Sequence, residues 1–533
     1  MASTSSAAKP KAIDLSHHLN ELSRSRVPSP LKDIIKYMKE PGMISLAGGL
    51  PHPDLFPFAE ITATSYVPDV DLRSTGGEDI HSTLNFSIPK NVSPSHQNTL
   101  SAALQYGTSY GSANLSSFIR EFTSRVMNPA YSDFEILLDS GNTDAWNKVV
   151  NILCEFGDYI LVEEHTYPSS QAVWAPMKCI GVPISIDKNG LIPESLHDTL
   201  KNWNNTHPGV KRPHLLYTVP VGHNPTGSTL SLERKKKIYE ICVEYDIIIC
   251  EDDPYYFLQF PPYTLRPSSS ETQKTAENPV AFDRQAYIES LVPTFISLDV
   301  QGRVIRLDTF SKTLGPGNRL GYLVCNPLFA ERILRATEVT TQSPSGLSQA
   351  LVEGLLTSWG QDGYLRWLSG LRDSYTSRRN WMCEIMAETF DLLPSPQNIT
   401  DDVVAVQKGH ASTKDTFPYF SFSFPKGGMF LWIKLYLAHN ATYQDLKATS
   451  SSGAVATAKW AEAFWMDLIK EKVLLVPGSY YTPIVGNNER MIQDSDVVFF
   501  RVAFSYETKE EMKIGIERMA VVFQRWWNGE ASA

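Results

Sequence analysis

Residues 247–255 read IIICEDDPY, an apolar run that stops at three acidic residues, a proline and a tyrosine. An unbroken apolar run of this length is typical of a strand that is buried on both faces of a parallel sheet. Similar runs occupy 159–162, 214–219 and 304–307, and each of them also ends in polar or turn residues. Segments with helical spacing, such as 115–126, alternate with these runs. The alternation predicts an α/β fold in which helices cover a mostly parallel sheet.

Length and composition restrict the class of protein further. A chain of 533 residues is longer than a single core usually becomes, so about two domains are expected. Hydrophobic residues make up 42% and charged residues 20%, and no apolar run is long enough to predict a membrane span. The net charge of -10 argues against nucleic acid as a partner, because that function needs a concentrated basic face. Any anionic ligand must therefore meet positive groups that are gathered locally.

The six cysteines and the N-terminal residues bear on the compartment. The cysteines contain no Cys-x-x-Cys pair and mostly lie among apolar neighbours, which predicts buried free thiols in a reducing environment. Residues 1–11 are rich in Ser and Ala but lack the apolar core of a secretory signal and the arginines of a transit peptide. We therefore expect a cytoplasmic protein.

Changes in composition divide the chain into four parts. We expect a flexible N-terminal tail over 1–28, an N-terminal arm and small-domain segment over 29–98, a large domain over 99–375 and a C-terminal small domain over 376–533. Two polar, turn-rich stretches, 69–97 and about 261–286, are interpreted as surface insertions without a chemical role.

Chemically distinctive residues follow three of the predicted strands. Asn224-Pro225-Thr226-Gly227 comes after 214–219, Asp252-Asp253-Pro254-Tyr255 after 247–250, and Thr309-Phe310-Ser311-Lys312 after 304–307, with Arg319 shortly beyond. In open α/β sheets, ligands bind beyond the carboxyl ends of the strands. These residues are therefore the leading candidates for a functional site.

The order Asn, Asp, Tyr, Ser-Lys, Arg resembles that of the fold-type I aminotransferases, which depend on pyridoxal 5′-phosphate (PLP), over nearly the whole chain from Ser29 to Trp527. Residues 29–31 (SPL) and 44–51 (ISLAGGLP) make the chain most similar to fungal aromatic amino acid and 2-aminoadipate aminotransferases and their relatives that act on kynurenine. The resemblance implies a large domain with a mostly parallel seven-stranded sheet between helices, and a smaller α+β C-terminal domain.

Lys312 is predicted to hold the cofactor covalently. Burial at the end of a strand lowers the pKa of a lysine, which suits an amine that must attack the cofactor aldehyde and form an imine. Once substrate has displaced it, the amine would move a proton between the substrate α-carbon and the C4′ carbon of PLP. A lone Ser-Lys pair would by itself indicate only a surface lysine, but the accompanying motifs favour the catalytic assignment.

Asp252 is predicted to pair with the ring nitrogen of the cofactor. A buried carboxylate needs a cationic partner, and a protonated pyridine nitrogen would serve, which keeps the ring able to accept electrons. Asp253 is the competing carboxylate, and a helix cap before Pro254 is the structural alternative for Asp252. The resemblance places the ring partner three residues before the tyrosine, which favours Asp252.

Other residues are predicted to hold the remaining atoms of PLP. Asn224 and Tyr255 can hydrogen-bond the phenolic oxygen, although Asn-Pro-Thr-Gly alone could be only a turn. Tyr167 can stack on the ring, a position that packing alone also explains. The phosphate is expected at the helix N-terminus that follows Ser140-Gly141, near Asn142 and Thr143. Further contacts are expected from the Thr309 and Ser311 hydroxyls and from Arg319.

The resemblance also implies a homodimer, because relatives take a phosphate-binding tyrosine from the neighbouring subunit. In this chain Tyr106 corresponds to that tyrosine. Relatives with Ser-Gln at the positions of Asn142 and Thr143 differ from this sequence, so the backbone contacts carry over more directly than the side-chain contacts.

Arg501 is the candidate that clamps the substrate carboxylate. It lies within an apolar stretch that predicts a strand of the small domain, and a guanidinium binds a carboxylate through two hydrogen bonds. A structural salt bridge is the alternative. Gly48 and Gly49 would let the backbone approach the substrate, or would form a plain turn. The histidines, including His165 and His223, have no metal-ligand spacing, so we predict local hydrogen bonding and no metal site.

Together these observations predict a PLP-dependent aminotransferase that exchanges amino groups between phenylalanine, tyrosine or tryptophan and 2-oxoglutarate, with 2-aminoadipate or kynurenine as further donors. A lyase of the same fold shares most of the motifs and would differ in its products, ammonia and pyruvate in place of a keto acid. A ligand-sensing regulator would carry an N-terminal DNA-binding helix-turn-helix, which the segment before Ser29 is too short to form.

Overall fold

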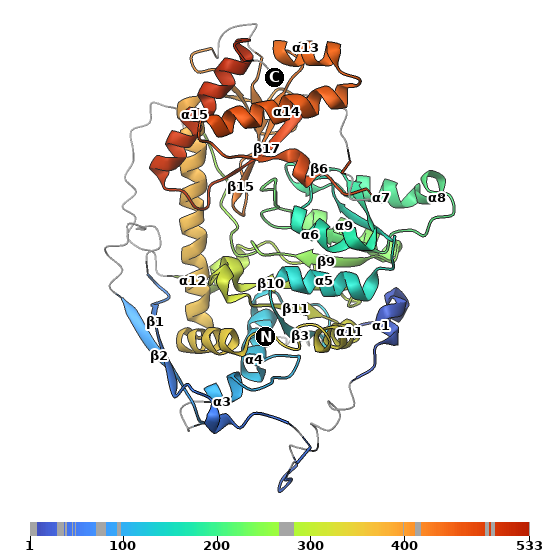
Figure 1. Cartoon of the computed structure of the whole chain (residues 1–533), viewed down its shortest axis with the longest axis vertical. Coiled ribbons are helices and arrows are strands. Elements are labelled where there is room, and N and C mark those ends of the chain that lie inside the picture. Colours follow the sequence, from blue (N-terminus) through green and yellow to red (C-terminus); the bar gives the residue numbers. More distant parts are fainter. Residues whose placement is uncertain are drawn as a thin grey trace, which may run out of the picture.

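The computed structural model describes residues 8–28, 37, 40–44, 46–47, 49–70, 82–92, 97–265, 282–397, 399–410, 417–485, 490–491 and 496–531. A large domain and a smaller C-terminal domain follow each other along the long axis of the molecule, and helix α12 (Gly346–Thr389) runs from one to the other (Figure 1). A kink at Gly360, where φ is 67°, interrupts this helix. The predicted domain boundary at 375/376 lies inside α12 and stays a proposal.

The large domain contains a seven-stranded sheet with the strand order β3-β11-β10-β9-β8-β4-β5. Its strands are β3 (Glu135–Asp139), β4 (Tyr159–Glu163), β5 (Ile180–Ile184), β8 (Leu215–Thr218), β9 (Ile248–Asp252), β10 (Val304–Thr309) and β11 (Gly321–Cys325). The pairs from β10 through β5 are parallel, whereas β11 is antiparallel to both of its neighbours. The predicted mostly parallel sheet of seven strands is therefore confirmed.

Helices cover both faces of this sheet, and each face has its own core. The principal covering helices are α4 (Ala113–Val126), α5 (Asn142–Leu153), α6 (Pro168–Trp174), α7 (Pro193–Lys201), α9 (Leu232–Glu244) and α11 (Pro327–Glu338). Successive β9 side chains alternate between the cores: Ile248 belongs to the same core as Trp146 of α5, and Ile249 to the same core as Ile238 of α9. This two-sided burial explains why the strands appear in the sequence as unbroken apolar runs.

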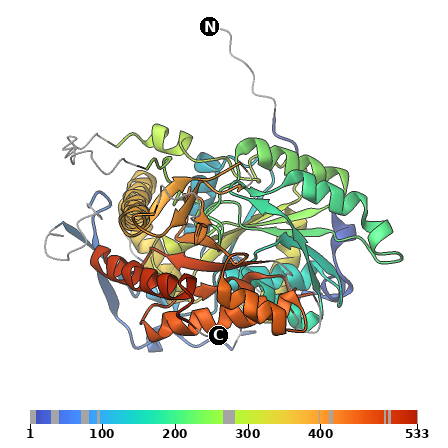
Figure 2. The ribbon, with the colours of Figure 1, turned by 90° about the horizontal axis from the view of Figure 1, so that it is seen from above.

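The C-terminal domain has a six-stranded antiparallel sheet with the order β12-β13-β14-β15-β17-β16. Its elements are β12 (Asp391–Pro394), β13 (Val403–Val406), β14 (Phe420–Phe422), β15 (Phe430–Tyr436), β16 (Val476–Pro477), β17 (Val497–Ala503), α13 (Ala441–Thr449), α14 (Gly453–Lys470) and α15 (Lys509–Trp527). Buried aromatic side chains, such as Trp460 of α14 and Phe523 of α15, fill the core of this domain. Seen from above, α14 and α15 lie next to this sheet (Figure 2).

The N-terminal residues differ from the flexible tail predicted for 1–28. In the described part, 8–28, Leu15 and Leu19 are buried, and the Ile13 N–H donates to the Gln301 carbonyl at 2.9 Å. The short helix α1 (Glu21–Ser25) lies beside α5 and α11 (Figure 1), and Asn20 caps it while its amide donates to the Cys154 carbonyl. The prediction is wrong for this stretch because the two leucines bury apolar surface against the large domain.

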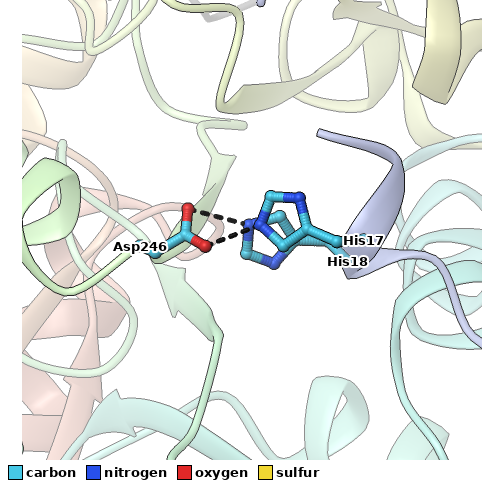
Figure 3. Close-up of side chains that lie close together, drawn as sticks. All are labelled: His17, His18 and Asp246. Carbon is cyan, nitrogen blue, oxygen red and sulfur yellow. Dashed lines mark hydrogen bonds and ion pairs between the residues drawn. The ribbon is translucent and has the colours of Figure 1, made fainter. Parts of the chain in front are cut away.

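Two histidines hold the same N-terminal segment at a second point. The Nε2 atoms of His17 and His18 lie 2.6 and 3.1 Å from the two carboxylate oxygens of Asp246 (Figure 3). Burial alone would raise the pKa of Asp246, but the hydrogen bonds from the two imidazoles lower it to about 2. One ligand atom from each of His17, His18 and Asp246 lies within 4.8 Å of the other two. A guanidinium nitrogen of Arg303 is 3.5 Å from one carboxylate oxygen of Asp246. The cluster joins the segment to Asp246, which lies two residues before β9.

The two predicted insertions are described only in part. Within 69–97, strand β2 (Thr83–Pro89) forms a hairpin with β1 (Glu60–Tyr66), and Ile88 is buried against Leu100 and Ala350. Residues 71–81 and 93–96 lie outside the described part, as do 266–281 of the second insertion. The smaller helices are α3 (Leu100–Ala103), α8 (Trp203–Thr206) and α10 (Arg284–Glu289). Across the described residues, every helix is too short or too polar to span a membrane.

Candidate active site

A cavity of about 500 Å³ opens at the carboxyl ends of β8, β9 and β10 and is closed on one side by the small domain. Eleven of the predicted site residues line it: Asn142, Thr143, Tyr167, Asn224, Asp252, Tyr255, Thr309, Ser311, Lys312, Arg319 and Arg501. The sequence-derived candidates, which are spread over more than 350 positions, therefore meet around one space. Their assigned roles remain predictions.

Lys312 lies in the short 3₁₀ helix η4 (Phe310–Lys312) that directly follows β10. Its amine is partly buried, and burial lowers its pKa. The nearby guanidinium groups of Arg319 and Arg501 lower that pKa further. The amine therefore loses its proton more readily than a solvated lysine does, which makes it a better nucleophile and base.

Asp252 is the last residue of β9, and its buried carboxylate receives two short hydrogen bonds. Asn142 Nδ2 donates to one oxygen and the Tyr217 hydroxyl to the other, both at 2.6 Å. Burial raises the pKa of Asp252, although these two donors act in the opposite direction. The two bonds hold the carboxylate at the cavity wall without neutralising its charge.

Asp253, the competing carboxylate, does not line the cavity. Because neighbouring strand residues point to opposite faces, Asp253 faces the other core, where Arg306 Nη1 donates to it at 2.9 Å. Arg306 is fully buried and also binds Asp308. Burial raises the pKa of Asp253 to about 7. The geometry thus separates a structural carboxylate from one that is available to a ligand.

The end of the cavity beside the N-terminus of α5 is suited to an anion. Gly141, with φ at 96°, precedes the first turn of α5, and the Thr309 and Ser311 hydroxyl oxygens lie 2.8 Å apart. Arg319 reaches this place: Nη2 donates to the Ser140 carbonyl at 3.1 Å, and Nη1 lies 3.4 Å from the Ser311 hydroxyl. A helix N-terminus, two hydroxyls and a guanidinium around one space are the donors that a phosphate group needs.

Arg501 extends from β17 into the cavity. Its Nη1 donates to Asn224 Oδ1 at 2.9 Å, and its guanidinium carbon lies 4.2 Å from the centre of the Phe430 ring and 5.5 Å from that of Tyr481. Its Nε atom is buried and has no hydrogen-bond partner among the described residues. The aromatic rings and Asn224 therefore orient a guanidinium that lines the cavity, where it can bind a ligand carboxylate.

The charges that line the cavity favour a ligand with negative groups at both ends. Among the described lining residues, Lys312, Arg319 and Arg501 are cationic, and Asp252 is the one carboxylate. This local excess of positive charge contrasts with the net charge of -10 of the whole chain. The cavity therefore suits a phosphate near Arg319, a carboxylate near Arg501 and a cationic ring atom near Asp252.

Several predicted residues lie elsewhere. Tyr106 is 70% exposed and does not line the cavity, and neither does Gly49; Gly48 lies outside the described residues. His223 hydrogen-bonds the Thr226 hydroxyl at 2.8 Å, as predicted. His165 differs from the hydrogen-bonding role predicted for it, because it packs against aromatic rings and its Nδ1 has no partner among the described residues.

Other residues that line the cavity were not predicted from the sequence, including Trp146, Ser170, Tyr217, Val219, Met429, Phe430 and Ser505. Helical spacing could have identified Trp146, since it lies four residues after Asn142 on α5. Tyr217 lies inside an apolar run that resembles any buried strand. No local signal distinguishes a tyrosine that contacts Asp252 from one that only packs.

The chain is similar to known proteins over nearly its whole length. The model of the family described as "Aminotransferase class I and II" matches residues 83–519. The chain is similar to "Aromatic amino acid aminotransferase C56E4.03" of Schizosaccharomyces pombe, with 38% identity over 97% of this chain and 99% of that protein. It is also similar to an "L-tyrosine:2-oxoglutarate aminotransferase" of Tapinella panuoides, with 34% identity over 97% of each.

Among solved structures, the aminotransferase Aro8 from Candida albicans is 34% identical and superposes with a TM-score of 0.83. The match covers 98% of this chain and 100% of that chain. The likeness therefore includes both domains.

Proposed function

Because this chain belongs to the aminotransferase class I and II family, we propose that it transfers amino groups between aromatic amino acids and 2-oxoglutarate, with PLP as its cofactor. Membership in the family makes the chain an enzyme, a transaminase. The names of its relatives support the aromatic donors and 2-oxoglutarate as acceptor. The observation that carries the proposal is a nucleophilic lysine, a fixed carboxylate and two separate arginines around one cavity.

The residues present fit this cofactor. Arg319, the two hydroxyls beside it and the N-terminus of α5 would hold the phosphate, and Asp252 would accept a hydrogen bond from the ring nitrogen. Asn224 and Tyr255 would bind the phenolic oxygen, and Tyr167 would lie against the ring. When bound, PLP supplies an electron-accepting ring that stabilises negative charge on the substrate α-carbon.

The chain's own groups would bind substrate and move the proton. Arg501 would bind the α-carboxylate, which an aromatic amino acid and 2-oxoglutarate share, so that one site serves both half-reactions. Lys312, with its lowered pKa, would take the proton from the substrate α-carbon and return it at the C4′ carbon of PLP. The ring of Phe430 and the side chain of Met429 would provide apolar surface for an aromatic donor.

The oligomeric state and compartment are also part of the proposal. We propose a homodimer in which the exposed Tyr106 reaches the phosphate of the partner's site. A cytoplasmic location is supported by six cysteines that are all buried free thiols, as expected in a reducing compartment.

The absorption spectrum of the PLP-loaded protein tests the function. Phenylalanine, tyrosine, tryptophan, kynurenine and 2-aminoadipate are added separately, followed by 2-oxoglutarate. We expect an aromatic donor to convert the cofactor band to that of the amino form, and 2-oxoglutarate to restore it. A protein without a cofactor band would contradict the proposal, and release of ammonia and pyruvate would favour the lyase.

A further inference from the structure

A buried pair of titratable side chains lies directly behind the cavity. Glu163, the last residue of β4, and His223, in the loop after β8, are 3% and 2% exposed. Glu163 Oε2 and His223 Nε2 lie 3.7 Å apart, and Glu163 Oε2 has no hydrogen-bond partner among the described residues. Neither residue lines the cavity. Burying a carboxyl and an imidazole costs free energy of folding unless hydrogen bonds satisfy them, and Glu163 Oε2 and His223 Nε2 have no such partner among the described residues.

The other carboxyl oxygen of Glu163 joins two strands. Its Oε1 accepts from the Thr218 hydroxyl at 2.5 Å and from the Val219 N–H at 3.3 Å, and both of these donors lie at the end of β8. This end of β8 carries Tyr217, which donates to Asp252. The carboxyl therefore fixes the point where the chain leaves the sheet and enters the loop that carries Asn224.

His223 fixes the next part of the same loop. Its Nδ1 lies 2.8 Å from the Thr226 hydroxyl, its N–H donates to the Ser228 carbonyl, and its own carbonyl accepts from the Gly227 N–H at 2.7 Å. The next residue, Asn224, accepts the hydrogen bond from Arg501. A chain of contacts thus runs from Glu163 through the loop to the guanidinium of the small domain.

We propose that Glu163 and His223 are positioning residues that hold Asn224 in place for its hydrogen bond to Arg501, and so set how tightly a substrate carboxylate is bound. The inference rests on the proposed function, because it assigns the pair to the carboxylate end of that same site. Asp252 and His165 are the other titratable groups that face the pair.

The protonation of Glu163 suggests a conservative variant. Burial raises the pKa of Glu163 to about 7, against the effect of the Thr218 and Val219 hydrogen bonds, and burial lowers the pKa of His223 to about 3. Near neutral pH the carboxyl therefore carries its proton for much of the time. Glutamine has the same shape as that neutral form and keeps an acceptor for Thr218 and Val219.

The test measures binding of 3-phenylpropanoate, which has the ring and carboxylate of phenylalanine but no amino group, to the PLP-loaded protein. We expect Glu163→Ala to raise the dissociation constant about tenfold, the effect of a weakened hydrogen bond to a charged group. Glu163→Gln should stay within about twofold of the unmodified protein. Glu164→Ala is the matched control, because this neighbouring carboxylate accepts from the Ile186 N–H, which lies outside the loop after β8.

A double-variant comparison separates positioning from general damage. If Glu163 acts through Asn224, Glu163→Ala combined with Asn224→Ala should bind no more weakly than Asn224→Ala alone. Additive losses, or equal binding by the Glu163→Ala and Glu164→Ala proteins, would overturn the proposal. Should Glu163→Ala fail to fold, His223→Ala carries the same test, with the same tenfold loss and non-additivity expected and unchanged binding as the contradiction.

Failure of the underlying function has a different signature. In that case the unmodified protein would show no cofactor band or would not bind 3-phenylpropanoate at all. If the unmodified protein binds PLP and 3-phenylpropanoate, and the Glu163 and His223 variants behave like the Glu164→Ala control, the positioning role is wrong but the proposed function stands.

Discussion

Individual residues that line the same cavity differ in their electrostatic surroundings. Lys312 is partly buried beside two guanidinium groups, whereas Asp252 is fully enclosed and held by two hydrogen-bond donors. The first arrangement lowers the pKa of the amine, and the second holds the carboxylate in place for a cationic partner. Single substitutions at these positions should therefore separate loss of chemistry from loss of folding.

Lys312→Ala should abolish turnover, with kcat reduced by about 10³-fold or more, because both the nucleophile and the proton-transfer group are removed. The absorption band of the lysine-bound cofactor should vanish while the melting temperature stays close to that of the unmodified protein. Lys178→Ala, at an exposed turn, is the control and should remain active. Retained turnover and retained absorption in the Lys312→Ala protein would remove this lysine from its role.

Asp252→Asn should impair catalysis, whereas Asp253→Asn should impair stability. Asp252→Asn should bind PLP but lose about 10²-fold or more in kcat, because the ring nitrogen lacks its anionic partner. Asp253→Asn should instead lower the free energy of unfolding by about 3 kcal/mol, since a partner of the buried Arg306 is lost. Enzyme kinetics measures the loss of kcat in the Asp252→Asn protein, and urea unfolding measures the loss of stability in the Asp253→Asn protein. A folded Asp252→Asn protein with near-normal turnover would show that another group protonates the ring.

At the scale of elements, the position of α5 relative to β10 creates the predicted phosphate site. The helix begins at a glycine with positive φ, and Arg319, itself in the left-handed region at φ 46°, reaches across to Ser140. Two residues with positive φ, Gly141 and Arg319, therefore lie at this junction. A Cβ atom at Gly141 would lie too close to the Arg319 guanidinium.

Gly141→Ala should weaken PLP binding at least about tenfold, because the new Cβ would lie 2.6 Å from Arg319 Nη2 and displace a phosphate ligand. Gly157→Ala is a matched control: its φ is 84°, but nothing lies within 4 Å of the new Cβ. Both variants should lose about 1–2 kcal/mol of stability from backbone strain, and only Gly141→Ala should lose cofactor affinity. Equal PLP dissociation constants for the two variants would contradict the phosphate assignment.

At the scale of the whole molecule, buried imidazoles couple stability to pH. Burial lowers the pKa of His165 to about 3, whereas in the unfolded chain the group titrates near 6.5. Between these values the unfolded state binds more protons, so this residue makes the folded state less stable as the pH falls. The same sign applies to His223 and to His18, whose pKa burial lowers to about 4.

His165→Phe should reduce this acid sensitivity while keeping the contacts with Trp432 and Phe499. The free energy of unfolding of the unmodified protein falls between pH 6.5 and pH 5, and in the His165→Phe protein this fall should be smaller by about 2 kcal/mol. The reason is that each pH unit contributes about 1.4 kcal/mol for one such group. Urea unfolding at both pH values measures it. His410→Phe, which replaces an exposed imidazole, should leave the difference unchanged; an equal change in both variants would contradict the assignment to His165.

The proposed sharing of Tyr106 between subunits also belongs to the whole molecule. The Lys312→Ala and Tyr106→Ala proteins should each be inactive or strongly impaired. When they are refolded together in equal amounts, about half of the dimers should be mixed, and each mixed dimer has one intact site of two. The mixture should therefore regain about a quarter of the unmodified activity. The mixture should elute as a dimer in size-exclusion chromatography. No recovery in mixed dimers would mean that Tyr106 acts within its own chain or not at all.

The sequence alone determined the fold class and most of the site, for one physical reason. Unbroken apolar runs mark strands buried on both faces, and the carboxyl ends of parallel strands meet at one edge of the sheet. Asn224, Asp252, Tyr255 and Lys312 could therefore be assigned to one place before any contact was known, and the structure brings them to one cavity.

The tertiary structure decided what depends on the direction of side chains and on distant partners. Strand alternation sends Asp252 to the cavity and Asp253 to Arg306, although the two are adjacent in the sequence. The burial of Leu15 and Leu19, and the contact between Glu163 and the loop after β8, join segments far apart along the chain. Local patterns contain no information about such pairs, because each pair is formed only when the packed domain brings its members together.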